Sequence, residues 1–282
     1  MKKIAVFLSL LATFSVTTYA KNDAKIATKS VDVYDEFDTL EAEFGIIVKY
    51  SQAPLSKAKI TGPANLIGHV EFDYSFSSLT VSFDTDYLPE LNESKEKITV
   101  TLSSPETDDF KARKGASIIA AGPINTDSGF TVDVETGATI SIPTATSSSE
   151  SLYAEAKSGG SISLGNCSFD ESNIEISSGA TISIASLNTQ ELDIEVSSGA
   201  TLTASNVNAK DSEIEVSSGA TCTISGKTGE LELEVSGGAT YNGSNFISNS
   251  ADVKVSGGAS ATINSIASDL DVDRTSSFAN KH

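Results

Sequence analysis

The sequence of 282 residues contains no tryptophan, one methionine and only two histidines, His69 and His282. Histidine is the usual acid–base group near neutral pH and a common metal ligand, so this composition argues against histidine-based catalysis and a histidine metal cage. Basic residues are also scarce, because 19 Lys and Arg stand against 38 Asp and Glu, for a net charge of −19. A chain this acidic repels phosphate backbones, so we expect no nucleic-acid partner.

The first twenty residues have the three parts of an export signal. Lys2 and Lys3 precede a mostly apolar run at 4–16, and Thr18 and Ala20 supply small residues for a cleavage site. The run is too short to span a bilayer, and no other long apolar run follows it. We therefore expect residues 1–20 to be a signal peptide and the mature chain, without a membrane span, to reach the periplasm, the cell surface or the medium.

From about Phe110 the sequence repeats itself. The segments IEISSGATISI (174–184), IEVSSGATLTA (194–204) and IEVSSGATCTI (214–224) are nearly identical. Eight such copies follow one another at intervals of 19 to 22 residues, which indicates stacked units instead of a closed globule. The glycines that mark them are Gly115, Gly137, Gly159, Gly179, Gly199, Gly219, Gly238 and Gly258.

Each copy predicts two short strands joined by a corner. Ile-Glu-Val alternates apolar and polar residues, Ser-Ser-Gly-Ala supplies a glycine that accepts positive φ, and Thr-Ile-Ser-Ile alternates again. A unit of this length without a helical period fits one coil of a parallel β-helix, and parallel crossovers are nearly always right-handed. We therefore predict an all-β, right-handed parallel β-helix (solenoid) with coils of roughly 20 residues over 106–270.

Stacked coils place equivalent residues in columns about 4.8 Å apart. Two columns are apolar and are predicted to fill the interior. The first contains Val132, Ala154, Ile174, Ile194, Ile214, Leu233 and Val253, and the second contains Ile140, Ile162, Ile182, Leu202, Cys222, Tyr241 and Ala261. Cys167 lies three coils before Cys222, about 14 Å away at this spacing, so we predict no disulfide between them.

Residues 21–105 lack this repeat but alternate like strands, for example at Val70, Phe72 and Tyr74. A solenoid end has open strand edges that must be covered. We therefore interpret 21–105 as a β-rich N-terminal cap or as divergent first coils. The tail at 271–282 is expected to form the other cap.

Two outward columns are candidates for function. The acidic one contains Asp133, Glu155, Glu175, Glu195, Glu215 and Glu234, and it lies beside Asp193, Glu213, Glu232 and Asp252. The other consists of two parallel columns of hydroxyl residues, which begin at Thr139 and Ser141 and continue through Thr181, Ser183, Thr201 and Thr203. Stacked carboxylates favour bound cations, so Glu175, Glu195, Glu215 and Glu234 are candidate ligands of a low-affinity divalent-cation face. The alternative is a solvated face that keeps the rod soluble. The hydroxyl columns suit hydrogen bonding to glycans or proteins, or are ordinary strand surface.

An enzyme of this fold usually needs long loops that build a cleft around a distinct acid pair. The nearly constant spacing leaves no room for such loops within the repeat, and the carboxylates recur in every coil without converging. We therefore expect no catalytic residues and no cofactor. A carbohydrate-active β-helix enzyme and a structural envelope protein that self-associates end to end are the alternatives.

The run FDTLEAEFGIIVKYSQ (37–52), the strands SLTVSF (78–83) and KITVTLSS (97–104) and the serial SSGA and SGGA corners resemble the putative auto-transporter adhesin, head GIN domain family. The resemblance extends over about 30–268. It implies a β-helical, exported envelope protein with a supposed adhesin role and no assigned catalytic residues. We therefore expect a non-enzymatic adhesion or interaction module whose partners are a protein or glycan at the envelope, or a second copy in a weak homo-oligomer.

Overall fold

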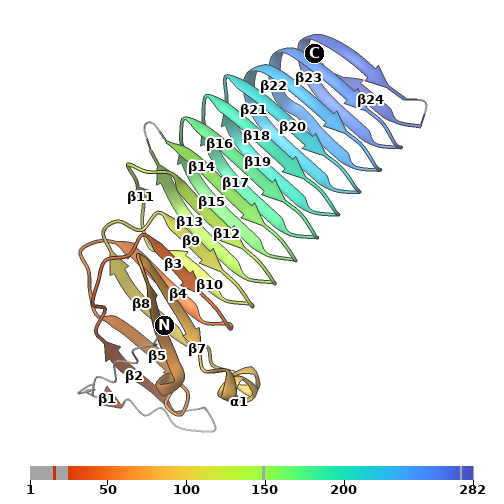
Figure 1. Cartoon of the computed structure of the whole chain (residues 1–282). Coiled ribbons are helices and arrows are strands. Elements are labelled where there is room, and N and C mark those ends of the chain that lie inside the picture. The colour runs from red at the N-terminus through yellow and green to blue at the C-terminus, as the bar shows by residue number, and fades with distance from the viewer. Residues whose placement is uncertain (1–14, 17–24, 148–149, 274, 282) are drawn as a thin grey trace, which may run out of the picture.

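The computed structural model describes residues 15–16, 25–147, 150–273 and 275–281. Its 24 strands belong to one hydrogen-bonded sheet, which winds right-handedly into a solenoid of about eight turns (Figure 1). The predicted fold class is confirmed. Most of the predicted signal peptide lies outside the described residues; its strand β1 (Ser15–Val16) pairs antiparallel with β2 (Ile26–Val31).

Each regular coil consists of a first strand, a corner and a longer second strand. In one such coil these strands are β16 (Glu171–Ile176) and β17 (Thr181–Asn188), and along β16 and the first half of β17 buried, mostly apolar residues alternate with more exposed ones. This alternation is why the sequence folds as strands, since successive side chains of a strand point to opposite faces. One face of every strand therefore enters the interior.

The corner between these strands is a tight turn with left-handed backbone. Ala180 N–H donates to the carbonyl of Ser177 over 3.1 Å, and φ is +54° at Ser178 and +69° at Gly179. Two successive positive φ values are those of a type I′ turn, for which glycine is favoured because it has no Cβ. Gly179 N–H then donates over 3.1 Å to Ser198 O in the next coil, so the corners are stacked as well.

The same pattern recurs along the rod. The other first strands are β9 (Asp109–Ala112), β12 (Phe130–Val134), β14 (Ser151–Ala156), β18 (Glu191–Val196) and β20 (Asp211–Val216). The other second strands are β10 (Ser117–Ala120), the short β11 (Ile124–Asn125), β13 (Thr139–Thr146), β15 (Ser161–Ser168) and β19 (Thr201–Asn208). Toward the C-terminus the sides merge into β21 (Thr221–Val235), β22 (Thr240–Val255) and β23 (Ser260–Val272), and β24 (Ser277–Asn280) follows.

Both predicted interior columns exist in the predicted register. Val132 aligns with Ala154, and that series continues to Val253. Ile140 begins the second series, which ends at Ala261. Every member of the two columns is buried, so branched aliphatic side chains stack into a dry core along the axis.

The second strands bend near their middle, and glycine allows this where coils approach closely. Gly226 has φ of +128°, and a Cβ added there would lie 2.0 Å from the carbonyl oxygen of Val207 in the preceding coil. A Cβ at Gly165 would lie 2.0 Å from Pro143 O. The bend turns the second strand into two sides, which gives the coil its third wall.

The N-terminal third contains coils that are stacked out of sequence order. β3 (Thr39–Ala42) pairs in parallel with both β7 (Ser78–Phe83) and β9, and β4 (Ile47–Gln52) with both β8 (Thr99–Ser104) and β10. The coil at 39–52 therefore lies between the coil at 78–104 and the first repeat. Its corner, Glu43 to Ile46, has the same turn with positive φ at Phe44 and Gly45.

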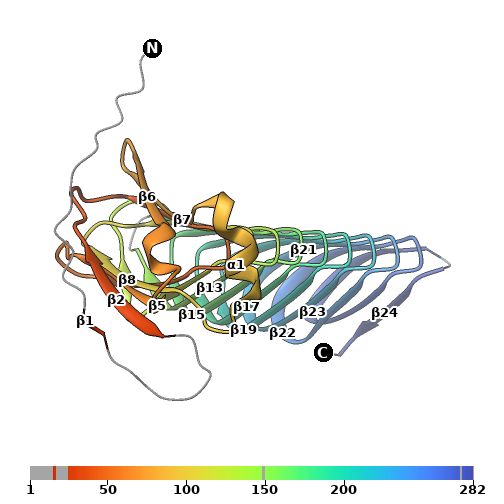
Figure 2. The same ribbon diagram turned by 90° about the horizontal axis from the view of Figure 1, so that it is seen from below.

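Antiparallel strands cover the outer edge of this end. β6 (Val70–Ser75) pairs with β7, β5 (Ala58–Pro63) pairs with β8, and β2 pairs with β5. The corner of the outermost coil is expanded into η2 (Thr85–Tyr87) and α1 (Leu88–Glu93), and η1 (Ile67–His69) precedes β6. Figure 2 shows α1 and the β6–β7 hairpin at the N-terminal end of the rod. The cap is thus built from both antiparallel strands and divergent coils.

Both cysteines are free and buried, as expected from their separation along the axis. Burial raises the pKa of the Cys167 thiol and of the Cys222 thiol to about 12. Neither is a thiolate at neutral pH, so both act as small apolar side chains.

The glycine geometry predicts a sharp difference between two alanine variants. Gly226→Ala forces a Cβ into the backbone of Val207 and should lower the free energy of unfolding by about 3 kcal/mol or more. Gly199→Ala adds a Cβ with no atom within 4 Å and costs only the left-handed backbone strain of about 1–2 kcal/mol. Urea unfolding followed by circular dichroism measures both, and equal losses would contradict this account of the bend.

Candidate functional site

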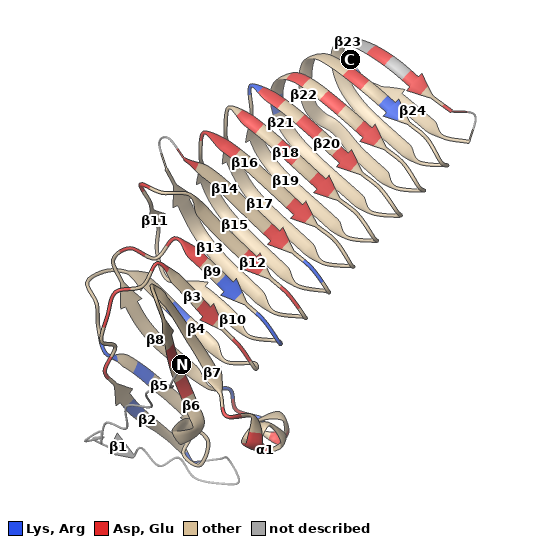
Figure 3. Cartoon of the chain, in the orientation of Figure 1, with Lys and Arg blue, Asp and Glu red and all other residues tan. Residues whose placement is uncertain are grey.

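The outward residues of the first strands form an acidic face. Figure 3 shows Asp and Glu recurring on one side of successive coils. We define the acidic face as the outward Asp and Glu residues at 171–252. The inward residues of the same strands are the apolar core column, so alternation along each strand separates aliphatic from carboxylate side chains.

The predicted central column is confirmed in register. Asp133 aligns with Glu155, and the series continues through Glu175, Glu195, Glu215 and Glu234. It then reaches Lys254 and Asp271, two positions that the sequence analysis did not assign. The neighbouring column Asp193, Glu213, Glu232 and Asp252 is also aligned, and Asp269 extends it.

A third acidic column was missed by the sequence analysis. It contains Glu171, Glu191, Asp211 and Glu230, which are aligned at the start of the first strands. These residues lie three positions before the repeated Ile-Glu-Val or its equivalent in each copy, outside the segments that define the repeat. Their own spacing of 20, 20 and 19 residues is the signal that could have identified them.

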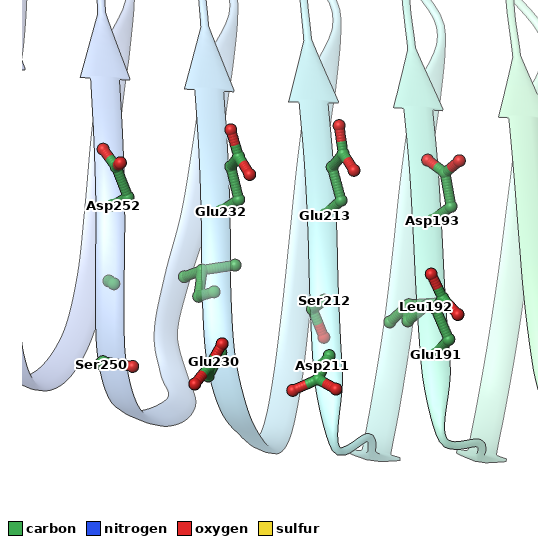
Figure 4. Close-up of a pocket in the computed structure, with 12 residues that line it drawn as sticks. Glu191, Leu192, Asp193, Asp211, Ser212, Glu213, Glu230, Glu232, Ser250 and Asp252 are labelled. Atoms are coloured by element: carbon green, nitrogen blue, oxygen red, sulfur yellow. The ribbon is translucent and has the colours of Figure 1, made fainter.

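A shallow hollow lies between the second and third acidic columns. Asp193, Glu213, Glu232 and Asp252 line one side and Glu191, Asp211 and Glu230 the other, with Leu192, Ser212 and Leu231 between them (Figure 4). The carboxylates point outward from successive coils at the same level of each strand (Figure 4). The arrangement offers a row of hydrogen-bond acceptors along the rod.

The acidic face is electrostatically unfavourable for the folded chain. Partial burial raises the pKa of Glu215, and the charges of Glu195, Glu234, Glu213 and Asp193 raise it further. Burial also raises the pKa of Tyr153, together with Glu155 and Glu175. Neighbouring carboxylates therefore repel one another, and a cation placed among them would relieve that repulsion.

Basic residues compensate outward carboxylates mainly in the coils that precede the acidic face. Arg113 contacts Glu41 at 3.0 Å, Asp133 at 2.9 Å and Glu135 at 3.4 Å, so one guanidinium connects three coils. One coil further along the rod, Lys157 pairs with Glu155 of its own coil. Within the described part of 171–252, the single ion pair joins Lys210 to Asp211 at 2.8 Å.

The carboxylates are spread along the rod instead of gathered at one point. Among the described residues, no group of three or more His, Cys, Asp or Glu side chains is arranged to hold a metal ion. Glu175, Glu195, Glu215 and Glu234 lie in consecutive coils, one residue in each. Their role as a low-affinity cation face stays a prediction.

The hydroxyl columns are aligned on the second strands. Thr139, Ser161, Thr181, Thr201, Thr221, Thr240 and Ser260 form one, and Ser141, Ser163, Ser183, Thr203, Thr223 and Thr262 form the other. Asn242 interrupts the second column, and the exposed Ile119 precedes it. The result is a mixed polar strip without a focal point.

Comparison with known proteins identifies a family and solved structures that match most of the chain. The family model described as "Putative auto-transporter adhesin, head GIN domain" matches residues 36–185 and 170–275. No curated protein matches the chain. None of the helices in the described residues is both long and apolar enough to cross a membrane.

Solved structures share the fold at low sequence identity. A putative adhesin from Parabacteroides merdae is 17% identical with a TM-score of 0.58, covering 92% of this chain and 97% of that one. A putative adhesin from Parabacteroides distasonis is 14% identical with a TM-score of 0.67 (91% and 98% covered). A putative lipid binding protein from the same species is 12% identical with a TM-score of 0.62 (93% and 98% covered). At these identities the likeness shows the fold.

The repulsion on the acidic face predicts a stabilising substitution. The raised pKa of Glu215 means that its ionised form disfavours folding. The stability that protonated Glu215 contributes is therefore present at low pH and is lost as pH rises through the pKa of the folded state. Glu215→Gln should therefore be more stable than the parent at pH 7, by less than about 1 kcal/mol for an exposed group. The difference should vanish below about pH 4, where the parent is protonated.

Urea unfolding at low ionic strength at the two pH values measures this effect, and high salt should reduce it. Glu71→Gln on β6, outside the acidic face, is the matched control. A destabilised Glu215→Gln at pH 7 would contradict the proposed repulsion.

Proposed function

The chain belongs to the putative auto-transporter adhesin, head GIN domain family, and from that premise we propose that it is an exported, non-enzymatic interaction module of the cell envelope. The observation that carries the proposal is the acidic face, in which three columns of carboxylates extend over successive coils in register. An extended surface with one repeated chemistry suits binding to a partner that is itself extended, such as an envelope protein or a glycan.

The distribution of charged groups supports a binding role over a catalytic one. Glycoside hydrolysis requires two carboxyl groups that flank one bond in different environments. On this rod Glu191, Asp211 and Glu230 occupy equivalent places in successive coils, so their environments are similar. The hollow of Figure 4 is shallow and is formed without inserted loops.

Export is proposed from the N-terminal segment and from the family. Lys2, Lys3 and the apolar run at 4–16 have the pattern of a signal peptide. The family's description as an adhesin head agrees with a location outside the cytoplasm. We propose the periplasm, the cell surface or the medium as the site of action.

The proposed function is tested in the source cell. The full chain should be recovered in the envelope or extracellular fraction, with residues 1–20 removed, and should cross-link there to an envelope protein or glycan. Neutralising the acidic face at Asp193, Glu213 and Glu232 (to Asn or Gln) should reduce cross-linking strongly. The matched control neutralises Glu71, Asp73 and Glu90 of the N-terminal cap and should cross-link like the parent.

Two results would contradict the proposal. The first is recovery of the chain in the cytoplasm. The second is turnover of a polysaccharide that is abolished by a single carboxylate substitution, since this would favour the carbohydrate-active alternative.

We further propose that divalent cations bind weakly to Glu175, Glu195, Glu215 and Glu234. The repulsion around Glu215 supports this, because a shared cation would compensate adjacent charges. Calorimetric titration with Ca²⁺ should show several weak sites, and Glu195→Gln combined with Glu215→Gln should remove part of the heat. A titration without heat would end the cation hypothesis.

A further inference from the structure

A cavity lined by both apolar and charged residues lies at the N-terminal end, beside α1. In the regular coils four residues turn the corner, as at Ser177 to Ala180. In the outermost coil, residues 84–98 separate β7 from β8 and contain η2 and α1. Among the described corners, this one is expanded into a helix. The helix forms one side of a cavity, and the two neighbouring corners form the other side.

The cavity has an apolar floor. Leu88 and Leu91 of α1 and Phe44 of the adjacent corner line it, and each is half-buried against the core. Its volume is about 390 Å³, within the size range of small-molecule sites. Glu90 and Glu93, the acidic residues of α1, do not line it.

The rim of the cavity is cationic, although the chain as a whole is strongly acidic. Lys97 and Lys114 both line it. Lys114 Nζ lies 2.8 Å from Glu43 and 4.3 Å from the centroid of the Phe44 ring, so its charge is compensated. Lys97 is exposed and forms no ion pair with another described residue. One positive charge therefore remains available at the rim.

A backbone donor is also available there. Corner glycines normally donate to the next coil, as Gly115 does to Thr136 O at 3.1 Å and Gly137 to Ser158 O at 3.2 Å. Gly45 lines the cavity and has no such hydrogen bond within the described part of the chain. An unpaired amide and an uncompensated ammonium group in the lining of one cavity favour an anionic oxygen ligand.

From this combination we infer that the cavity between α1 and the Phe44–Gly45 and Lys114–Gly115 corners binds a carboxylate carried on an apolar alkyl chain. The carboxylate lies between Lys97 Nζ and Gly45 N–H, and the chain packs on Phe44, Leu88 and Leu91. The site is separate from the acidic face, so its failure would leave the proposed function intact.

The test uses the full chain and three soluble probes of equal chain length, octanoate, octanol and octylamine, in calorimetric titrations. Octanoate should bind at one site, at least about tenfold more tightly than octanol, because the charge-assisted contacts add to the apolar contact. Octylamine should not bind. Lys97→Gln should weaken octanoate about tenfold without changing octanol, and Leu91→Asp should abolish both.

Glu93→Gln, on the same helix but outside the cavity lining, is the matched control and should bind like the parent. Lys97 is exposed, so Lys97→Gln should keep the core intact, and an unchanged thermal unfolding midpoint of this variant verifies that. If Leu91→Asp fails to fold, the test is decided by Lys97→Gln alone. The inference is overturned if octanoate does not bind, if octanol binds equally well, or if Lys97→Gln leaves octanoate affinity unchanged.

Discussion

Backbone hydrogen bonding between parallel coils is the constraint on which the rest of this molecule depends. Because β16 pairs with β18 and β18 with β20 without a register shift, each residue lies over its equivalent in the adjacent coil. Because the sequence repeats about every twenty residues, side chains of the same chemical type lie over one another. The consequence is favourable inside, where Ile174, Ile194 and Ile214 form a continuous aliphatic stack, and unfavourable outside, where Glu175, Glu195 and Glu215 repel one another.

This conflict is resolved differently at the two ends of the acidic surface. Near the N-terminus, Arg113 contacts carboxylates of the two coils that flank its own and compensates them. From Glu171 onward the columns have little compensation from basic side chains, and the pKa of Glu215 is raised accordingly. Retaining this repulsion over several coils costs stability, which is consistent with a surface whose partner supplies the missing positive charge.

The N-terminal end both closes the rod and carries the expanded corner of the outermost coil. β5 pairs antiparallel with β8 and β6 with β7, and these strands cover edges that would otherwise be free to pair with another chain. The same end carries the cationic cavity beside α1, the opposite in charge to the acidic face. The rod therefore presents two chemically different surfaces at different places along its axis.

The sequence alone determined the solenoid, its core columns and two of the three acidic columns, because Ile-Glu-Val-Ser-Ser-Gly-Ala repeats at a nearly constant interval and alternation assigns each side chain to a face. It did not reveal the coil at 39–52, whose corner contains Phe44 in place of the usual serine and whose neighbour in space is distant in sequence. The third acidic column was not identified because its members lie just outside the repeated segments. Only the tertiary structure decided that 39–52 lies between 78–104 and 109–125, that the bend at Gly226 passes against Val207, and that Lys97, Gly45 and Leu91 meet at one cavity. These are contacts between segments that share no repeat, so no periodicity in the sequence records them.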